Sequence, residues 1–170
     1  MKKKIVKKNK IVNLEAFTPW VARDYYELAN SSQDISIYVP GLVEDSFPLT
    51  SMMVNNFAKC DFLTEFAFVI TDSFHTPVGA LLASQNLVLN SLDVYYFIGA
   101  QHRHKGYMRA ALKEFVAYAK ATTPYHNLIF DVRVDNEKSQ RLLESLGCRN
   151  LGITNWYAIE SYFQYELEIK

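Results

Sequence analysis

The segment from residue 93 to about 121 combines a strand-like run, a basic turn and a helix-like run. The run 93–98 is apolar and aromatic, and the turn 103–108 has the sequence Arg-His-Lys-Gly-Tyr-Met. The first N–H groups of a helix lack internal partners and carry partial positive charge, to which Arg103 and Lys105 add full charges. Gly106 lets the backbone approach an anion without an intervening side chain. The segment therefore predicts a phosphate-binding turn.

The glycine pattern of this turn argues against two common nucleotide-binding motifs. A dinucleotide-binding fold needs three glycines, and a P-loop needs Gly-Lys-Ser/Thr after a longer loop. The turn 103–108 has neither pattern. Taken alone, it is also consistent with an ordinary strand–turn–helix in which the basic turn is merely solvated.

A second strand–helix unit follows. Residues 127–134 alternate as a half-buried strand does, and Asp135 or Asn136 can cap the helix that comes next. Ser139 shares one helix face with three leucines, and Gly147 can end the helix.

These two units together resemble the GNAT superfamily of acyl-CoA N-acyltransferases. Arg103 and Gly106 match the family's Gln/Arg-x-x-Gly-x-Gly/Ala pyrophosphate loop. Asn136, Ser139 and Gly147 match its Asn-x-x-Ser/Ala…Gly-Phe helix. The nearest branch by this resemblance is the ribosomal-protein N-terminal acetyltransferase (RimJ/RimL-like) type.

The resemblance implies acetyl-CoA as co-substrate, with its pyrophosphate on the turn. In the family, the pantetheine arm lies between two splaying parallel strands, here 93–98 and 128–134, and borrows main-chain hydrogen bonds from the first. The family prefers Gly or Ala where this chain has Met108, whose flexible side chain can face the core. The residues so assigned to the cofactor are Tyr96, Phe97, Ile98, Arg103, His104, Lys105, Gly106, Tyr107, Met108 and Asn136.

The resemblance also implies two catalytic residues. Asp93 occupies the place of a glutamate that draws a proton off the amine through water, and some base is required because an ammonium cannot attack. Ser139 occupies the place of a serine proposed to protonate the leaving thiolate, whereas the tyrosine that many relatives carry four residues later is Leu143 here. The alternatives are a solvated aspartate and a small packing serine.

Neither the histidines nor the cysteines predict a metal site or a disulfide. His102 and His104 are two residues apart, which is not a helical metal spacing, and no carboxylate or cysteine cluster accompanies them. Cys60 and Cys148 are far apart in sequence and predict free thiols in a reducing compartment. We expect no metal cofactor.

Charge and length predict a single domain with a basic tail. The formal net charge is zero, but residues 1–10 hold six lysines and no acid. We expect 1–10 to be a frayed tail, or a weak tether to an acidic surface, and 11–170 to form one acyl-CoA N-acyltransferase domain. No direct nucleic-acid binding, no membrane span and no leader are expected, which favours the cytoplasm.

The pattern of elements predicts an α/β (α+β) fold with the order β-α-α-β-β-β-α-β-α-β-β. We expect a GNAT-like mixed, mostly antiparallel sheet of about six to seven strands with helices on both faces. The expected strands are 11–17, 65–71, 78–83, 91–98, 127–134, 148–153 and 162–169, and the expected helices start near Thr18–Pro19, Thr50 or Ser51, Gly106 and Asn136. Residues 31–47 are expected to be a loop.

The function expected from the resemblance is direct transfer of an acetyl group from acetyl-CoA to a primary amine in a ternary complex. The first candidate acceptor is a protein or peptide N-terminus. The alternatives are a small amine or a CoA-binding relative without turnover. An open groove near 31–47 would favour a peptide, and a closed pocket a small amine. A monomer or a homodimer is expected.

Overall fold

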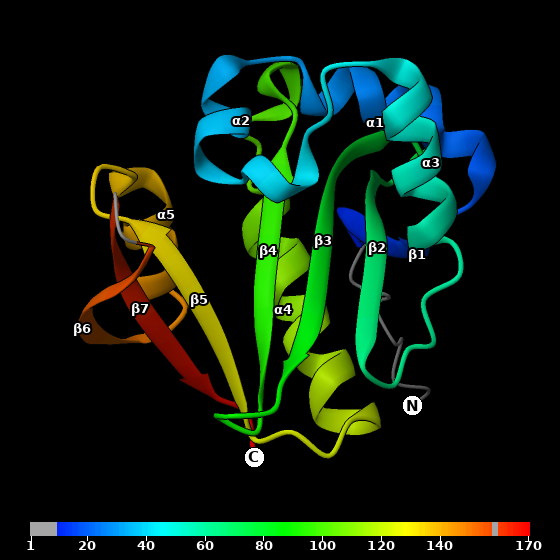
Figure 1. Ribbon diagram of the computed structural model, residues 1–170. Helices are drawn as coiled ribbons and strands as arrows, with labels where there is room; N and C mark the ends of the chain where they lie inside the picture. Colours follow the sequence, from blue (N-terminus) through cyan, green and yellow to red (C-terminus); the bar gives the residue numbers. More distant parts are fainter. Residues whose placement is uncertain (1–9, 158–159) are drawn as a thin grey trace, which may run out of the picture.

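A computed structural model describes residues 10–157 and 160–170, which form one seven-stranded sheet with helices on both faces (Figure 1). The strands are β1 (Val12–Ala16), β2 (Glu65–Asp72), β3 (Pro77–Asn86), β4 (Ser91–Ile98), β5 (Asn127–Arg133), β6 (Arg149–Tyr157) and β7 (Glu160–Glu168). The helices are α1 (Ala22–Ala29), α2 (Gln33–Tyr38), α3 (Phe47–Phe57), α4 (Tyr107–Thr122) and α5 (Glu137–Glu144). Short 3-10 turns lie at Pro19–Val21, Pro40–Leu42 and Ala100–His102. The predicted fold class is confirmed.

The strand order is β1-β2-β3-β4-β5-β7-β6, and β4–β5 is the parallel pair in an otherwise antiparallel sheet. The connection from β4 through α4 to β5 is the expected strand–helix–strand crossover. β4 and β5 pair only at Leu92–Leu128 and Asp93–Ile129. Beyond these residues the two strands diverge, as Figure 1 shows, so the sheet is split at its centre.

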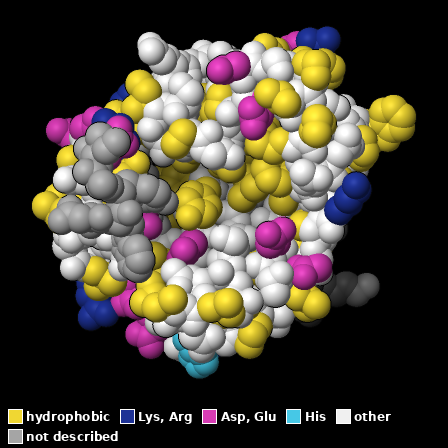
Figure 2. All heavy atoms as spheres, in the orientation of Figure 1, with side chains coloured by type: hydrophobic (Ala, Val, Ile, Leu, Met, Phe, Trp, Pro, Cys, Tyr) yellow, Lys and Arg dark blue, Asp and Glu magenta, His cyan; other side chains and the backbone are white. Residues whose placement is uncertain are grey.

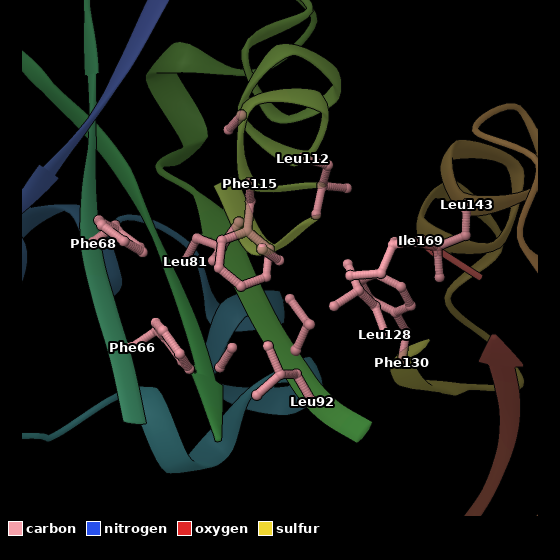
Figure 3. Close-up of a cluster of buried hydrophobic side chains, with 14 of the residues drawn as sticks. Phe66, Phe68, Leu81, Leu92, Leu112, Phe115, Leu128, Phe130, Leu143 and Ile169 are labelled. Atoms are coloured by element: carbon pink, nitrogen blue, oxygen red, sulfur yellow. The ribbon is translucent and has the colours of Figure 1, made fainter. Parts of the chain in front are cut away.

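Two apolar cores cover the two faces of the sheet. On one face, Leu112 and Phe115 of α4 pack over the strands, while Leu143 of α5 packs near Leu128 (Figure 3). On the other face, α1 and α3 bury Tyr25 and Val54 against the sheet. This division follows from the alternation of side chains along each strand. The first core includes residues of both diverging strands, among them Leu92 and Leu128 at their paired end.

The predicted loop 31–47 is wrong in part, because it contains α2 and the turn Pro40–Leu42. α2 has six residues, and Ile35 is its buried side chain. A helix this short is not stable by itself and leaves little periodic signal in the sequence. Tertiary contacts, described below, hold it.

Other boundaries also differ from the predictions. α3 begins at Phe47, after Ser46 and with Pro48 in its first turn, rather than at Thr50 or Ser51. β6 continues to Tyr157, beyond the predicted end at 153.

The predicted tail lies mostly outside the described residues. Lys10, its last residue, pairs with Glu114 of α4 at 2.8 Å. Among the described helices, none is both long and apolar enough to cross a membrane.

Candidate active site

A cleft of about 1480 Å³ opens where β4 and β5 separate. It is bounded by α2 and the turn after it, β4, the segment 102–109, β5, the start of α5 and two residues of β7. In the described chain, the edge of β4 beyond Asp93 pairs with no strand on the β5 side. An extended ligand can therefore lie along this edge in the place of a neighbouring strand. The diverging strands that the sequence predicted are confirmed.

The turn before α4 has the geometry of an anion site. Gly106 has φ +77°, and a Cβ built there meets nothing within 4 Å. A left-handed conformation favours glycine, and the open space leaves room for a ligand. No side chain caps α4, so the N–H groups of its first turn have no capping partner in the described chain. Gly106, Tyr107 and Met108 all line the cleft.

Three predicted cofactor residues also have structural roles. Arg103 makes two bonds to Asp34 of α2, at 2.8 and 2.9 Å, and a third from Nε to the carbonyl of Ile98 at 3.2 Å. The Phe97 ring packs against Tyr25 of α1, with centroids 5.6 Å apart, on the sheet face that α1 and α3 cover. The Met108 side chain packs partly into the core, as the sequence suggested.

His104 and Lys105 lie in the same turn. His104 lines the cleft and has a left-handed backbone, with φ 61°. The Lys105 ammonium lies 6.0 Å from the centroid of the Tyr107 ring, within reach of a cation–π interaction.

The start of α5 brings a second group of polar residues to the cleft. Oδ1 of Asn136 accepts from the Ser139 N–H at 3.2 Å, so Asn136 caps the helix. The Ser139 hydroxyl lies 2.6 Å from the Tyr96 hydroxyl of β4. Burial raises the pKa of Tyr96, which keeps its hydroxyl protonated. The Tyr96 ring lies edge-on to Phe130 of β5, with centroids 6.2 Å apart.

Two aspartates lie on the opposite face of the sheet from Tyr96. Asp93 is aligned with Ile129, and Asp131 follows two residues later on β5, so the two aspartates share a face. Both oxygens of Asp93 accept from Asn86, at 3.0 and 3.1 Å, and Asp131 accepts from Gln164 at 3.1 Å. Burial raises the pKa of both carboxyls.

Asp131, unlike Asp93, lines the cleft. The sequence analysis missed Asp131, although its alternation with Phe130 and Val132 could have placed it on the polar face of β5. Figure 2 shows acidic and apolar side chains around the central hollow of this face and basic side chains at its rim.

The remaining candidates give no sign of metal or thiol chemistry. In the residues that the structure describes, no group of three or more His, Cys, Asp or Glu side chains is placed to hold a metal. Burial raises the pKa of Cys148 to about 11, and Cys60 and Cys148 are both free thiols. Burial lowers the pKa of His102.

A family model described as an acetyltransferase (GNAT) domain matches residues 12–149. The chain belongs to the GNAT acetyltransferase family. The matched range includes the diverging strands, the turn and α5, so the family assignment covers the whole cleft except the residues from β7. A search of curated proteins finds no match.

Solved structures show the same fold over nearly the whole chain. A GNAT-family acetyltransferase from Bacillus anthracis matches with TM-score 0.82 and 17% identity, covering 95% of this chain and 97% of that one. A spermidine N-acetyltransferase from Vibrio cholerae, solved with CoA and spermine, matches with TM-score 0.78 and 20% identity over 94% and 96% of the two chains.

The microcin C7 self-immunity acetyltransferase MccE, solved with acetyl-CoA and AMP, matches with TM-score 0.80 and 15% identity over 94% and 93% of the two chains. At these identities the likenesses show the shared fold. The substrates named for these proteins belong to them, and they do not determine the acceptor of this chain.

Proposed function

We propose that this GNAT acetyltransferase moves an acetyl group from acetyl-CoA to a primary amine, with a peptide or protein N-terminus as the first candidate acceptor. The observation that carries the proposal is the split between β4 and β5, which ends beside the turn that leads into α4. An extended arm with a diphosphate at one end fits such a slot.

Backbone groups provide most of the proposed cofactor contacts. The first N–H groups of α4 bind the pyrophosphate, and Lys105 and His104 add side chains at the turn. The pantetheine arm binds along the edge of β4 from Tyr96 to Ile98, where no strand pairs on the β5 side. Asn136 caps α5 through its oxygen, which leaves its amide N–H₂ for the arm. Arg103 acts mainly by fixing the turn, because Asp34 already occupies its guanidinium.

The acceptor amine loses its proton to the carboxylates of β4 and β5. Asp93 is the residue that the family resemblance assigns, and Asp131 is the carboxylate that lines the cleft. A raised pKa makes a carboxylate a better base once it is ionised. We therefore propose that Asp131 takes the proton from the amine, directly or through water. Burial raises the pKa of both carboxyls, and Asp93, at the paired end of the two strands, helps to keep the pKa of the pair raised through its negative charge.

The reaction follows as direct attack in a ternary complex. The neutral amine attacks the thioester carbon, the C–S bond breaks, and the electron pair leaves on sulfur. In this proposal the Ser139 hydroxyl, at the start of α5, donates a hydrogen bond to that sulfur, and solvent protonates the thiolate. No acyl group is transferred to the protein.

The shape of the cleft bears on the choice of acceptor. Its volume of about 1480 Å³ is larger than a typical pocket for one small molecule, as a cleft that holds acetyl-CoA and an acceptor together requires, and α2 forms one wall of it. A peptide N-terminus is the first candidate because the family resemblance implies it. Asp131 of the cleft has no ion pair among the described residues, and this favours a second candidate acceptor, a cationic polyamine, which is the class named for the Vibrio cholerae relative. The cytoplasmic location and the monomeric or dimeric state stay predictions.

Calorimetric titration with acetyl-CoA tests the cofactor site. We expect micromolar binding to the wild type and at least about tenfold weaker binding to Gly106→Ala, because a side chain at φ +77° strains the turn by about 1–2 kcal/mol and points into the open space. Gly152→Ala is the matched control, since Gly152 of β6 has φ +103° and lies outside the cleft. Equal binding by wild type and Gly106→Ala would contradict the assigned turn.

An acceptor screen tests the rest of the proposal. Peptides with free and with blocked N-termini are compared with spermidine by following the release of the CoA thiol. Acetylation of the free peptides alone supports the first candidate, and acetylation of spermidine alone replaces it by the second. Acetyl-CoA binding without transfer to any amine would instead make the protein a CoA-binding relative without turnover.

A further inference from the structure

The hydroxyl oxygens of Tyr96 and Ser139 are 2.6 Å apart, which is hydrogen-bond distance. This contact joins β4 to α5, the elements on either side of the slot, and both residues line the cleft. A role for this contact in catalysis rests on the proposed function, in which Ser139 faces the thioester sulfur.

Ser139 bonds differently from three hydroxyl residues of the other helices. The hydroxyls of Ser36, Thr50 and Thr122 each donate to a backbone carbonyl three or four residues earlier. Such back-bonding is the usual fate of serine and threonine in helices. In the described chain, Tyr96 is the partner of the Ser139 hydroxyl, and no helix carbonyl is. The Ser139 hydrogen is thus not committed to the helix.

Geometry allows either hydroxyl of this pair to donate. A phenol O–H is more acidic than a serine O–H, which makes Tyr96 the better donor and Ser139 the better acceptor. If Tyr96 donates to Ser139, then the Ser139 hydrogen must point elsewhere, and the cleft is open to it. A hydroxyl that accepts one hydrogen bond also donates a stronger one.

We propose that Tyr96 is a positioning residue that aims the Ser139 hydroxyl at the sulfur of the bound thioester. When the amine attacks and the C–S bond breaks, the electron pair goes to sulfur, and the Ser139 O–H donates a hydrogen bond to the thiolate. The proton that the amine loses leaves through Asp131 to water, and solvent protonates the thiolate on release. Many relatives carry a tyrosine at the position of Leu143 on α5. In this chain, the tyrosine hydroxyl near the proposed sulfur position comes instead from Tyr96 of β4.

The first test is kinetic. Tyr96→Phe keeps the ring against Phe130 and removes only the hydroxyl. We expect kcat to fall by about tenfold or more, because the hydrogen bond from Ser139 to the thiolate becomes weaker and less well directed without the bond from Tyr96. The KM for acetyl-CoA should stay nearly unchanged. Ser139→Ala should lower kcat at least as much, and the double variant should be no slower than Ser139→Ala. Tyr118→Phe is the control, because the Tyr118 ring packs on Phe66 and Phe68 of β2 and does not line the cleft.

The second test does not depend on the acceptor. The pKa of the CoA thiol bound to the protein is measured from the ultraviolet absorbance of the thiolate. A hydrogen bond from Ser139 stabilises the thiolate, so we expect the pKa of the bound thiol to lie higher in Tyr96→Phe and Ser139→Ala than in the wild type. A purely structural role for Tyr96 would change thermal stability and leave this pKa unchanged.

The outcomes separate the two proposals. If the wild type transfers acetyl and Tyr96→Phe matches it in kcat and in the pKa of the bound thiol, this inference is overturned and the proposed function stands. If the wild type binds acetyl-CoA but transfers to no amine, the function fails, and an unchanged thiol pKa in the variants overturns the inference as well.

Discussion

At the residue scale, the site depends on side chains whose surroundings change their chemistry. Tyr96 and Ser139 share a hydrogen bond on one face of the sheet, while Asp93 and Asp131 share the other face. Burial raises the pKa of both aspartates, which is unfavourable for folding when they are ionised. Such a cost is characteristic of groups kept for catalysis.

We expect Asp131→Asn to slow turnover by about a hundredfold or more and to leave acetyl-CoA affinity nearly unchanged, because the variant lacks the proposed base. Asp93→Asn should have the same direction and a smaller effect, since Asp93 does not line the cleft. Steady-state kinetics across pH measures both. The wild type should lose activity as pH falls through the raised pKa, and Asp131→Asn should lack that step. An unchanged turnover rate in Asp131→Asn would show that Asp131 is not the base, and Asp93 would then be the remaining candidate.

We expect Asp131→Asn to keep or raise the thermal stability of the protein. Because the pKa of Asp131 is raised in the folded state, ionisation lowers stability as pH rises from the unfolded pKa through the folded pKa. At neutral pH the wild type therefore carries this cost in full. Thermal unfolding of Asp131→Asn at pH 7 should show an equal or higher Tm, which would separate lost catalysis from lost structure.

At the element scale, α2 is the part of the cleft that depends most on contacts distant in sequence. The carboxylate of Asp34 accepts two bonds from Arg103, and Oδ1 accepts a third from Ser32 at 2.5 Å. The Ser31 hydroxyl, just before α2, accepts from the Ala100 N–H at 2.8 Å. These bonds connect one wall of the cleft to the chain that leads into the proposed phosphate turn.

We expect Asp34→Asn to loosen α2. Amide hydrogen exchange at residues 33–38 should become faster at pH 7, and the KM for the acceptor should rise more than that for acetyl-CoA. The free energy of unfolding should change by no more than about 1 kcal/mol, because the pair is partly exposed. Arg149→Gln, which breaks the exposed pair of Arg149 with Glu166, is the control and should leave α2 unchanged.

The pair also predicts a pH dependence. The bonds from Arg103 lower the pKa of Asp34, so its stabilisation is present above the unfolded pKa and is lost as pH falls through the folded pKa. NMR signals of α2 should therefore shift in the wild type at acid pH and not in Asp34→Asn. A wild type without this acid step would contradict the role of the pair.

At the scale of the whole molecule, the two cores leave one split in an otherwise continuous sheet. Tyr96 approaches the split from the face of α4 and α5, while Asp131 approaches it from the face of α1 and α3. The residue proposed to act near the thioester and the residue proposed to deprotonate the amine thus reach the split from opposite faces of the sheet. This arrangement is consistent with binding of acetyl-CoA and the amine at the same time.

We therefore expect a sequential mechanism. Initial rates with varied acetyl-CoA and acceptor should give intersecting lines in double-reciprocal plots, and mass spectrometry of the intact protein after acetyl-CoA alone should find no acetylated enzyme. Neither described cysteine lines the cleft, and the pKa of Cys148 is raised to about 11, so its thiol is a poor nucleophile at neutral pH. Parallel lines with a trapped acetyl-enzyme would rule out direct transfer.

The sequence by itself determined the family, the order of most elements and the position of the turn before α4. These depend on local signals: the alternation of strands such as 127–134, the glycine in the turn 103–108 and the Asn136 cap, all of which the structure reproduces. Patterns of this kind span a few residues and have a direct physical cause in backbone geometry and burial.

Only the tertiary structure decided which side chains face one another. The contacts of Arg103 with Asp34 and of Tyr96 with Ser139 join residues 69 and 43 positions apart, and Asp131 reaches the cleft because β5 turns away from β4. Such pairings depend on the divergence of two strands and on helix packing, and no local pattern encodes them. The α2 residues that line the cleft belong to a helix too short to form without such contacts.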